Sequence, residues 1–554
     1  MSPLLRTLAY LLLPPLALAA NLAELKLRGP SGLPASASHE LHPALSSFSI
    51  ETAFLITYLG NVSAPNRLTL DLLDNLHERT GVPAEIRIGG ITADSTYWNG
   101  SQTQAAFNFI DDKGVLHNTT IGPAFFKAMS LLPKRTKITM NLNLDDLDYE
   151  GALEVARATW TGLGPDRVVA FELGNEPDHY SRPVQTPKSY ANIWKTWSRN
   201  ITQALKLPKP LFQIAATAED PLWPYDAPGA QDQLGCVSAL AAGANEFGTA
   251  NYCSEHTYQY SVCDPPRQAI ATLPNLVNHT RLAMFLDLWQ PRIRSVRAQL
   301  GPHSYLNGEY SSVSCSGRNN VSNTFGQALW LLDTTLYSAS LNISRLYIHQ
   351  GGPLALQSST QLNRGGLSFY NLWYPIDNLN GNVTVFPSYS AYLFLTEAIG
   401  KSKTLKLANI YPGRQANLSS ITTEMGDTSA GQLVAYGFWD TALKQKGPTK
   451  LALINMEIYN KTQADAGVKR PRTVFDISAY LPQNAAVGSG REIPPPVVTV
   501  KRLQAPGADI KDGGLTTWAG QSFLMGKGKG ELVTETFQGG RIPVRASEAV
   551  LVFL

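Results

Sequence analysis

Two glutamates stand where short apolar runs end, which is a typical setting for a catalytic pair. Glu176 follows the apolar run 168–173 and lies in the turn Gly174-Asn175-Glu176-Pro177-Asp178. Glu309 closes a second short run, 304–308, more than a hundred residues later. A carboxylate at the rim of a buried strand is partly desolvated, so its pKa can rise until it carries a proton near neutral pH. Glycoside hydrolysis needs two such carboxylates facing one site.

The same stretches resemble a known family. The motifs Leu173-Gly174-Asn175-Glu176-Pro177-Asp178 and Arg87-Ile88-Gly89-Gly90, with Glu309, resemble the retaining (β/α)8 glycosidases and, within them, glycoside hydrolase family 79. That is the β-glucuronidase and heparanase family, and the resemblance spans most of the chain after the first twenty residues. It implies a general acid/base at Glu176 and a nucleophile at Glu309, with carboxylates about 5–5.5 Å apart. The alternatives are a buried, ion-paired Glu176 and a surface Glu309 after an Asn307-Gly308 turn.

The resemblance also implies roles for four polar residues around the pair. Asn175 would hydrogen-bond the sugar 2-hydroxyl, and Tyr258 would donate to Glu309 and keep it ionised. Asp94 would hold sugar hydroxyls and Arg87 would support the nucleophile, although a simple ion pair between Arg87 and Asp94 is the alternative.

Two further polar residues are in phase with the glutamates. His256 is two residues before Tyr258 and shares its strand face, so it either lines the site or is a satisfied core histidine. Glu172 is in phase with Gly174 and Glu176, and we interpret it as a structural residue that points into the fold.

A glucuronidase must also bind the carboxylate of its sugar. The segment Ser312-Val313-Ser314-Cys315-Ser316-Gly317-Arg318 after Glu309 is the best candidate, because its backbone N–H groups and hydroxyls can form an anion nest. Arg318 could instead supply a charge-assisted pair. Tyr310 and Gly317 are included as substrate-binding candidates. The alternative is an ordinary Ser/Gly loop held by Cys315.

The chain has four cysteines, Cys236, Cys253, Cys263 and Cys315. An even number predicts two disulfides in an oxidising compartment, with three possible connectivities. If Cys253 lies on the sixth strand, Cys263 and Cys315 belong to neighbouring loops, which favours Cys263–Cys315 and Cys236–Cys253. No His/Cys cluster has the spacing of a zinc site, and the proposed chemistry needs no metal or organic cofactor.

Alternating strand and helix patterns must position these residues. The expected strands are 47–58, 84–90, 137–144, 168–173, 211–218, 251–260, 304–311 and 345–351. The expected helices are 68–79, 125–132, 149–161, 187–205, 232–242, 280–300, 323–340 and 389–399. Eight such units predict an α/β fold with a (β/α)8 barrel over 43–400. A doubly wound sheet is second choice, because residues 58–62 form no phosphate-binding loop.

From residue 401 to 554, short alternating runs between Gly, Pro and Asn turns predict an antiparallel β-sandwich. The resemblance implies that a strand in 21–27 joins it, with a linker up to residue 42. Residues 1–20 have the charge, apolar run and small-residue end of a signal peptide. Ten Asn-X-Ser/Thr triplets agree with a secreted glycoprotein: Asn61, Asn99, Asn118, Asn200, Asn278, Asn320, Asn342, Asn382, Asn417 and Asn460.

Composition is that of a globular protein, with 44% hydrophobic residues, 16% charged residues and a net charge of +3 over 554 residues. The small net charge gives no support to nucleic-acid binding, and no segment after the signal peptide is long and apolar enough for a membrane span. We therefore expect a secreted, retaining exo-β-glucuronidase acting on terminal glucuronic or 4-O-methylglucuronic acid of a carbohydrate. The alternatives are a heparanase-like endo-enzyme, a non-catalytic carbohydrate-binding protein, and a related glycosidase for a neutral sugar.

Overall fold

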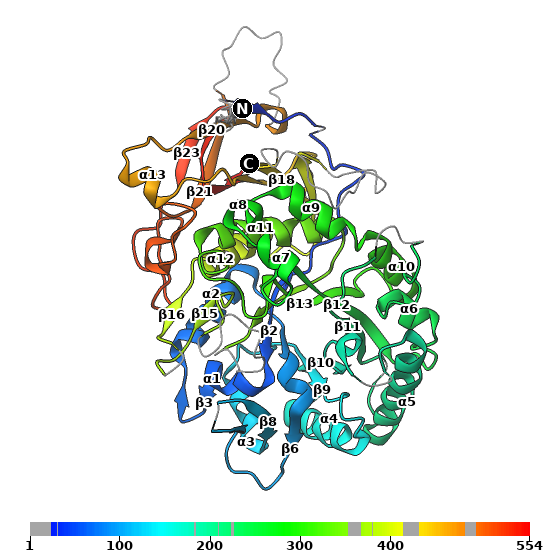
Figure 1. The fold of residues 1–554 in the computed structure, drawn as a ribbon. Coiled ribbons are helices and arrows are strands. Elements are labelled where there is room, and N and C mark those ends of the chain that lie inside the picture. The colour runs from blue at the N-terminus through cyan, green and yellow to red at the C-terminus, as the bar shows by residue number, and fades with distance from the viewer. Residues whose placement is uncertain are drawn as a thin grey trace, which may run out of the picture.

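The computed structural model describes residues 24–554 except 30, 113, 182–183, 209, 223–226, 353–366, 379–380, 414–430 and 482–494. The described residues form a closed barrel with a β-sandwich packed against it (Figure 1). The expected signal peptide and the triplet at Asn417 lie outside these ranges. Among the helices that are described, none has the length and apolar character needed to cross a membrane.

Eight parallel strands close the barrel in chain order. They are β2 (Ser46–Glu51), β5 (Ile86–Gly89), β9 (Ile138–Leu142), β10 (Val168–Leu173), β11 (Phe212–Thr217), β12 (Ala250–Ser261), β13 (Tyr305–Ser314) and β14 (Leu346–Gln350). β14 pairs with β2 and completes the ring. Most residues of these strands are buried, because helices cover the outer face and side chains fill the inner one. The predicted (β/α)8 fold is confirmed.

Helices surround the barrel, and their ends follow local capping rules. The main ones are α2 (Arg67–Thr80), α3 (Pro123–Ala128), α4 (Tyr149–Leu163), α5 (Pro187–Leu205), α6 (Cys236–Ala241), α9 (His279–Asp287), α10 (Gln290–Leu300), α11 (Phe325–Ser340) and α12 (Tyr389–Ile399). Asn66, Asp148 and Thr186 each accept a backbone N–H from the first turn of α2, α4 and α5.

Two expected elements differ from the structure, and one sheet was not expected. The first strand ends at Glu51, and the chain turns into a short 3-10 helix, η1 (Thr52–Phe54), and then α1 (Leu55–Leu59). The single helix expected over 280–300 is two helices, because Pro291 lacks an N–H and is placed in the first turn of a new helix. An additional sheet of β6 (Thr96–Trp98), β7 (Ala106–Ile110) and β8 (Leu116–Ile121), not expected from the sequence, precedes α3.

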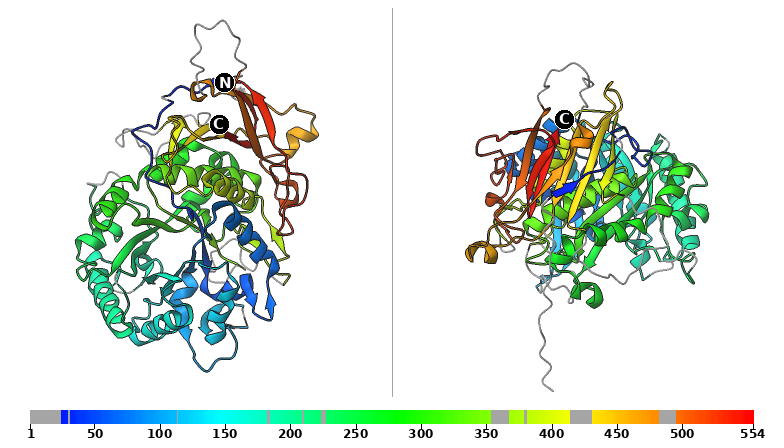
Figure 2. Two further views of the ribbon diagram at one scale, coloured as in Figure 1. Left: turned by 180° about the vertical axis from the view of Figure 1, so that it is seen from behind. Right: turned by 90° about the horizontal axis from the view of Figure 1, so that it is seen from above.

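The sandwich consists of two sheets, seen from two further sides in Figure 2. The larger sheet has the order β17 (Leu405–Tyr411), β18 (Leu433–Asp440), β19 (Lys450–Asn455), β25 (Glu548–Phe553), β21 (Val497–Gln504) and β22 (Thr517–Trp518), with β23 (Glu535–Gln538) beside β21. The smaller sheet contains β1 (Glu24–Lys26), β20 (Arg472–Asp476) and β24 (Arg541–Arg545). β1 pairs with β20 in parallel, so this N-terminal strand belongs to the sandwich and departs from its antiparallel pattern.

The larger sheet is buried on both faces. Successive side chains of a strand point to opposite faces, so neighbouring residues belong to different cores. On β19, Leu451 and Leu453 pack into the core shared with the smaller sheet. Ala452 and Ile454 belong to the core shared with the barrel helices. α11 lies between this sheet and the barrel, which explains why every residue of that helix is buried.

We expect Leu407→Ala to destabilise the protein. Leu407 is fully buried on the sheet face that packs against the barrel helices, so truncation leaves a cavity costing about 2–5 kcal/mol. Urea unfolding measures the change in the free energy of unfolding. Leu443→Ala is the matched control, since Leu443 is 51% exposed and its truncation should cost no more than about 0.5 kcal/mol. Equal effects would show that the contact between sandwich and barrel is loosely packed.

Candidate active site

A cavity of about 750 Å³ opens at the carboxyl ends of the barrel strands. All the described residues that line it lie between Glu51 and Tyr370, which is the part of the chain that forms the barrel. Asn175, Glu176, Tyr258 and Glu309 are among these residues. The carboxyl end of a parallel barrel is where catalytic side chains from several strands meet.

Glu176 is placed by a strained turn after β10. Gly174 has a φ of 83°, and Glu176 itself has a φ of 53°, which is uncommon for a residue with a side chain. The backbone N–H of Glu176 donates to the carbonyl of Ala216, 2.9 Å away, and this bond holds the turn against β11. Such strained backbone is frequent at functional sites.

The Glu176 carboxylate lies between two histidines. His256 Nδ1 is 2.9 Å from Oε1, and His179 Nδ1 is 3.7 Å from Oε2. Burial raises the pKa of Glu176, but hydrogen bonding and charge from His179 and His256 lower it by more. The His179 pKa rises to about 9 through its interaction with Glu176. His256 is therefore a partner of Glu176, not an independent core histidine.

Glu309 is held by donors from three other strands. Tyr258 Oη donates to Oε1 at 2.8 Å, and Arg87 Nη1 donates to Oε2 at 2.8 Å. His349 Nδ1 lies 3.4 Å from Oε2. Burial raises the pKa of Glu309, but the positive charges of His349, His256 and Arg87 lower it by more, so the net shift is downward. The hydrogen bond from Tyr258 is the one that the resemblance implies.

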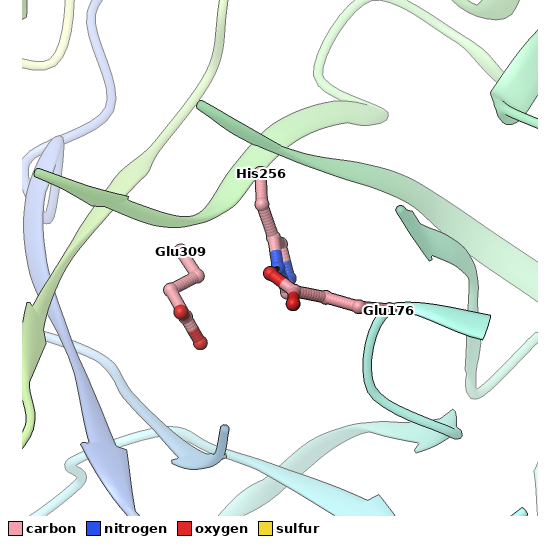
Figure 3. Close-up of side chains that lie close together, drawn as sticks. All are labelled: Glu176, His256 and Glu309. Carbon is pink, nitrogen blue, oxygen red and sulfur yellow. Dashed lines mark hydrogen bonds and ion pairs between the residues drawn. The ribbon is translucent and has the colours of Figure 1, made fainter. Parts of the chain in front are cut away.

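The two glutamates face each other across a short gap (Figure 3). One carboxylate oxygen of Glu176, one of Glu309 and a ring nitrogen of His256 all lie within 4.8 Å of one another. A retaining glycosidase places its carboxyl groups about 5–5.5 Å apart, whereas an inverting enzyme needs about 6.5–9.5 Å for a water. The observed separation agrees with the retaining geometry.

Arg87 joins the nucleophile to the barrel interior. Its Nε donates to Glu172 at 2.7 Å, and its Nη2 donates to Asn175 Oδ1 at 2.8 Å. Glu172 also accepts hydrogen bonds from Asn141 and Gln213, which fits the structural role expected for it. Burial alone would lower the Arg87 pKa, but the carboxylates of Glu172 and Glu309 raise it overall.

Asp94 holds the backbone next to the acid/base. It forms no ion pair with Arg87, and it is not among the described residues that line the cavity. Its carboxyl group accepts a hydrogen bond from Tyr180 Oη at 2.7 Å and contacts the backbone N–H of Asn175 at 3.3 Å. Burial raises the pKa of Asp94. The residue therefore helps to fix Asn175, and its contact with sugar hydroxyls stays a prediction.

Glu309 faces the cavity because β13 carries a bulge. Glu255 pairs with Asn307 but His256 pairs with Glu309, which leaves Gly308 as the extra residue. A Cβ on Gly308 would overlap Ser254 Oγ on β12. The Asn307-Gly308 pair is thus part of a buried strand, and the alternative of a surface turn is wrong.

The prediction that Tyr310 binds the substrate is wrong. It follows Glu309 on the same strand and faces outward, where its hydroxyl contacts Thr335 and Tyr392. It is fully buried there. Side-chain alternation along a strand excludes both residues from pointing inward together.

The loop after β13 contributes only part of the expected segment. Ser314, Cys315 and Ser316 line the cavity, and Cys315 and Ser316 have φ values of 60° and 72°. Gly317 is not in the cavity wall; its φ is 80° and a Cβ would lie 2.8 Å from Tyr370 N, so it is needed for the turn. Arg318 donates to the carbonyls of Gln268 and Ala271, which removes it as the expected partner of a sugar carboxylate.

Both disulfides have the expected connectivity. Cys263–Cys315 ties the loop after β12 to the loop after β13, and Cys236–Cys253 ties α6 to β12. The first bridge therefore fixes one wall of the cavity.

Sequence reasoning missed many residues of the cavity wall, and four of them are Glu51, Arg267, His349 and Tyr370. Glu51 and His349 stand at or near the ends of the first and last barrel strands, so their position in the predicted strands was an available signal. Arg267 lies in α7 (Pro265–Ala269), and Tyr370 follows β14 in a loop. No pattern in the sequence marks either as a site residue.

Comparison with known proteins gives relatives along nearly the whole chain. The model of the glycosyl hydrolase family 79 C-terminal beta domain matches residues 435–551. A beta-glucuronidase of Neurospora crassa is 27% identical over 88% of this chain and 85% of its own length. A beta-glucuronidase of Aspergillus niger is 28% identical over 87% of this chain and 83% of its own.

The matched domain and the two relatives agree with the resemblance to glycoside hydrolase family 79. Solved structures agree with this resemblance at the level of the fold. A 4-O-α-L-rhamnosyl-β-D-glucuronidase from Fusarium oxysporum covers 96% of this chain and 100% of its own, with a TM-score of 0.73 and 21% identity. A family 51 arabinofuranosidase from Xanthomonas axonopodis covers 96% and 98%, with a TM-score of 0.57 and 13% identity.

We expect Gly308→Ala to lower both stability and activity. Its new Cβ must displace Ser254, and overpacking of this kind costs about 1–3 kcal/mol. The double variant Ser254→Ala/Gly308→Ala should recover much of the loss, because the nearest remaining atoms would lie 3.3 Å away. Ser254→Ala alone is the control, since Ser254 Oγ is buried without a hydrogen-bond partner. Thermal unfolding and an activity assay measure both effects. Equal melting temperatures and activities for Gly308→Ala and the double variant would contradict the close contact between Gly308 and Ser254.

Proposed function

We propose that this protein is a secreted, retaining exo-β-glucuronidase that removes terminal β-linked glucuronic or 4-O-methylglucuronic acid from a carbohydrate. The observation that carries the proposal is the short gap between Glu176 and Glu309, with Glu309 held ionised by Arg87 and Tyr258. The relatives named beta-glucuronidase support the substrate class.

In the proposed reaction Glu309 attacks the anomeric carbon and forms a glycosyl ester, while the bond to the leaving oxygen breaks. Glu176 gives a proton to that oxygen and then takes one from the water that hydrolyses the ester. Asn175 lies beside both glutamates, with its Oδ1 bound by Arg87, so its orientation is fixed before substrate binds. That suits a hydrogen bond to the sugar 2-hydroxyl that strengthens in the transition state.

The proton for the leaving group is available next to Glu176. His179 and His256 lower the pKa of Glu176, and the pKa of His179 rises to about 9, so His179 carries a proton near neutral pH. His256 Nδ1 lies 2.9 Å from the Glu176 carboxylate and holds it in position. Glu309 instead stays ionised beside its cationic neighbours. It therefore serves as the nucleophile, while Glu176 serves as the acid.

The sugar carboxylate would bind at the end of the cavity beyond Glu309. Ser314 and Ser316 line that wall, and the left-handed backbone at Cys315 and Ser316 brings successive peptide groups close to the cavity. Cys263–Cys315 fixes the loop. This placement favours a glucuronidase over a glycosidase for a neutral sugar, because small hydroxyls and peptide N–H groups suit an anion.

The cavity wall favours the exo-enzyme over the heparanase-like alternative. Among the described residues that line it, Arg267 is the sole lysine or arginine, and it pairs with Asp220 at 3.4 Å. The acidic lining residues are Glu51, Glu176, Glu219, Asp220, Asp264 and Glu309. A sulfated or uronate-rich chain would be repelled by such a wall. The complete catalytic pair disfavours a non-catalytic carbohydrate-binding protein.

Secretion is part of the proposal, supported by residues 1–20, the two disulfides and the glycosylation triplets. The triplets are not equivalent. Asn61 and Asn99 are exposed, whereas Asn278 is 2% exposed and its side chain caps α9, so Asn278 is unsuited to carry a glycan.

Hydrolysis of aryl β-glucuronide, β-galactoside and β-xyloside tests the proposal. We expect release from the glucuronide alone, and Glu309→Ala should lower it by about 10⁴-fold or more because the nucleophile is lost. Azide should restore turnover in Glu176→Ala by attacking the glycosyl ester. Chain-length reduction of heparan sulfate without aryl glucuronide cleavage would indicate the endo-enzyme, and release from a neutral glycoside alone would contradict the carboxylate pocket.

The acidic limb of the pH profile of kcat/KM should depend on His349. Glu309 reacts as the carboxylate, and its lowered pKa keeps it ionised at pH values where an ordinary glutamate would be protonated. Burial lowers the His349 pKa, but Glu309 and Glu51 raise it by more, so His349 is charged in this pH range. His349→Gln removes that charge, raises the pKa of Glu309 and moves the acidic limb to higher pH. An unmoved limb with unchanged KM would exclude His349 from this role.

A further inference from the structure

A second cavity lies where the barrel meets the sandwich, and we call it the junction cavity. It has a volume of about 450 Å³. Arg79 of α2 and Glu397 of α12 line it from the barrel. Lys450 of β19 and Lys501 of β21 line it from the sandwich. No described residue lines both this cavity and the catalytic one, so the two are separate sites.

Glu397 is the largely buried acid of the junction cavity, and two cations share its charge. Lys501 pairs with Oε1, and Trp518 Nε1 donates to Oε2 at 2.8 Å. Arg79 Nε lies 3.8 Å from Oε2, which is too far for a hydrogen bond, and it is buried without a hydrogen-bond partner. Glu78, the other acid among the described lining residues, is exposed to solvent, which screens its charge.

Lys450 adds a third cation, which forms no ion pair with a described carboxylate. Its Nζ donates to the carbonyl of Ala398 at 2.8 Å, in the last turn of α12. Burial lowers the pKa of Lys450, and the charges of Glu397 and Asp440 raise it by less. Closing the carboxyl end of a helix is a common structural role for lysine, but it uses one of the three donors of an ammonium group. The remaining donors are left for an anion in the cavity.

The junction cavity has more room than a simple anion needs. Its volume lies within the range of about 300–1,000 Å³ that is typical of small-molecule sites. Leu532 and Phe553 add apolar surface, and the ring centroid of Phe553 lies 5.8 Å from Lys501 Nζ. Gln521, whose Nε2 donates to the carbonyl of Gly530, adds a fixed amide. Charge, apolar surface and an amide in one cavity suit a sugar ring that carries an oxyanion.

We propose that the junction cavity binds an oxyanion group, a carboxylate or a phosphate, carried by a molecule of about the size of one sugar. Arg79, Lys450 and Lys501 bind the oxyanion, and the ring packs against Leu532 and Phe553. Because these cations come from both the barrel and the sandwich, the bound anion stabilises the contact between the two parts. The site does not depend on the reaction proposed for the catalytic cavity.

Calorimetry and thermal unfolding of the full-length protein test this site with galacturonate, glucose 6-phosphate and neutral galactose, at constant ionic strength. We expect at least one of the two charged sugars to bind and to raise Tm, because a ligand that binds only the folded protein stabilises it. Galactose should do neither, since it has no group for the cations. Binding of galacturonate alone identifies a carboxylate ligand, and binding of glucose 6-phosphate alone identifies a phosphate ligand.

Two variants place the binding in the junction cavity. Lys450→Gln keeps an amide donor near the end of α12 but removes the charge, and it should weaken binding about tenfold, because one charge-assisted hydrogen bond is lost. Lys501→Gln should weaken binding by a similar factor. Lys444→Gln is the matched control, because Lys444 is exposed in the turn before β19 and its substitution changes the net charge equally. We expect Lys444→Gln to bind as tightly as the wild-type protein.

Four results would overturn the proposal: no binding of either charged sugar, equal binding of galactose, an affinity that survives both Lys450→Gln and Lys501→Gln, or an equal loss in Lys444→Gln. If Lys450→Gln does not fold, Lys501→Gln decides the outcome. Failure of the proposed function would appear as lack of aryl glucuronide cleavage, which this binding test does not use.

Discussion

The buried guanidinium of Arg87 is the interaction on which the centre of the barrel depends. It pairs with two buried carboxylates, Glu172 and Glu309, and its charge opposes the rise in the pKa of Glu309 that burial causes. Its third contact, to Asn175, connects the nucleophile to the turn that carries the acid/base. Removing one partner from such a cluster leaves an uncompensated buried charge, which is far more costly than the cluster itself is stabilising. Structure and catalysis thus rely on the same side chain.

The two glutamates differ in chemistry because they differ in neighbours. Glu309 is surrounded by permanent or raised-pKa cations and a phenol, so its charge is fixed. Glu176 lies between two histidines, and the pKa of one of them, His179, rises to about 9 through this contact. Two identical residue types therefore acquire the separate tasks of nucleophile and proton carrier, as a double displacement requires.

The sandwich contributes to this arrangement from outside the cavity. Its larger sheet buries one face against the smaller sheet and the other against α11 and α12. These helices pack behind β13 and β2, where Tyr310 and Tyr392 meet. The outward face of β13 is therefore held by packing against these helices, which limits the movement of Glu309 on its inward face. N-terminal β1 closes the smaller sheet, so both ends of the described chain lie in the sandwich (Figure 1).

The amino-acid sequence by itself determined the barrel, the sandwich and the two glutamates, and it favoured one of three pairings of the cysteines that the structure then confirmed. Strand period, helix period and turn residues are local, and the motifs around Glu176 and Glu309 are continuous in the chain. Tertiary structure alone decided which polar residues reach the cavity. The bulge at Gly308 directs the Glu309 side chain into the cavity, and side-chain alternation along the strand directs Tyr310 outward. Asp94 accepts a hydrogen bond from Tyr180. His349 lies beside both Glu309 and Glu51 because β14 and β2 close the ring, and this closure brings together residues about three hundred positions apart.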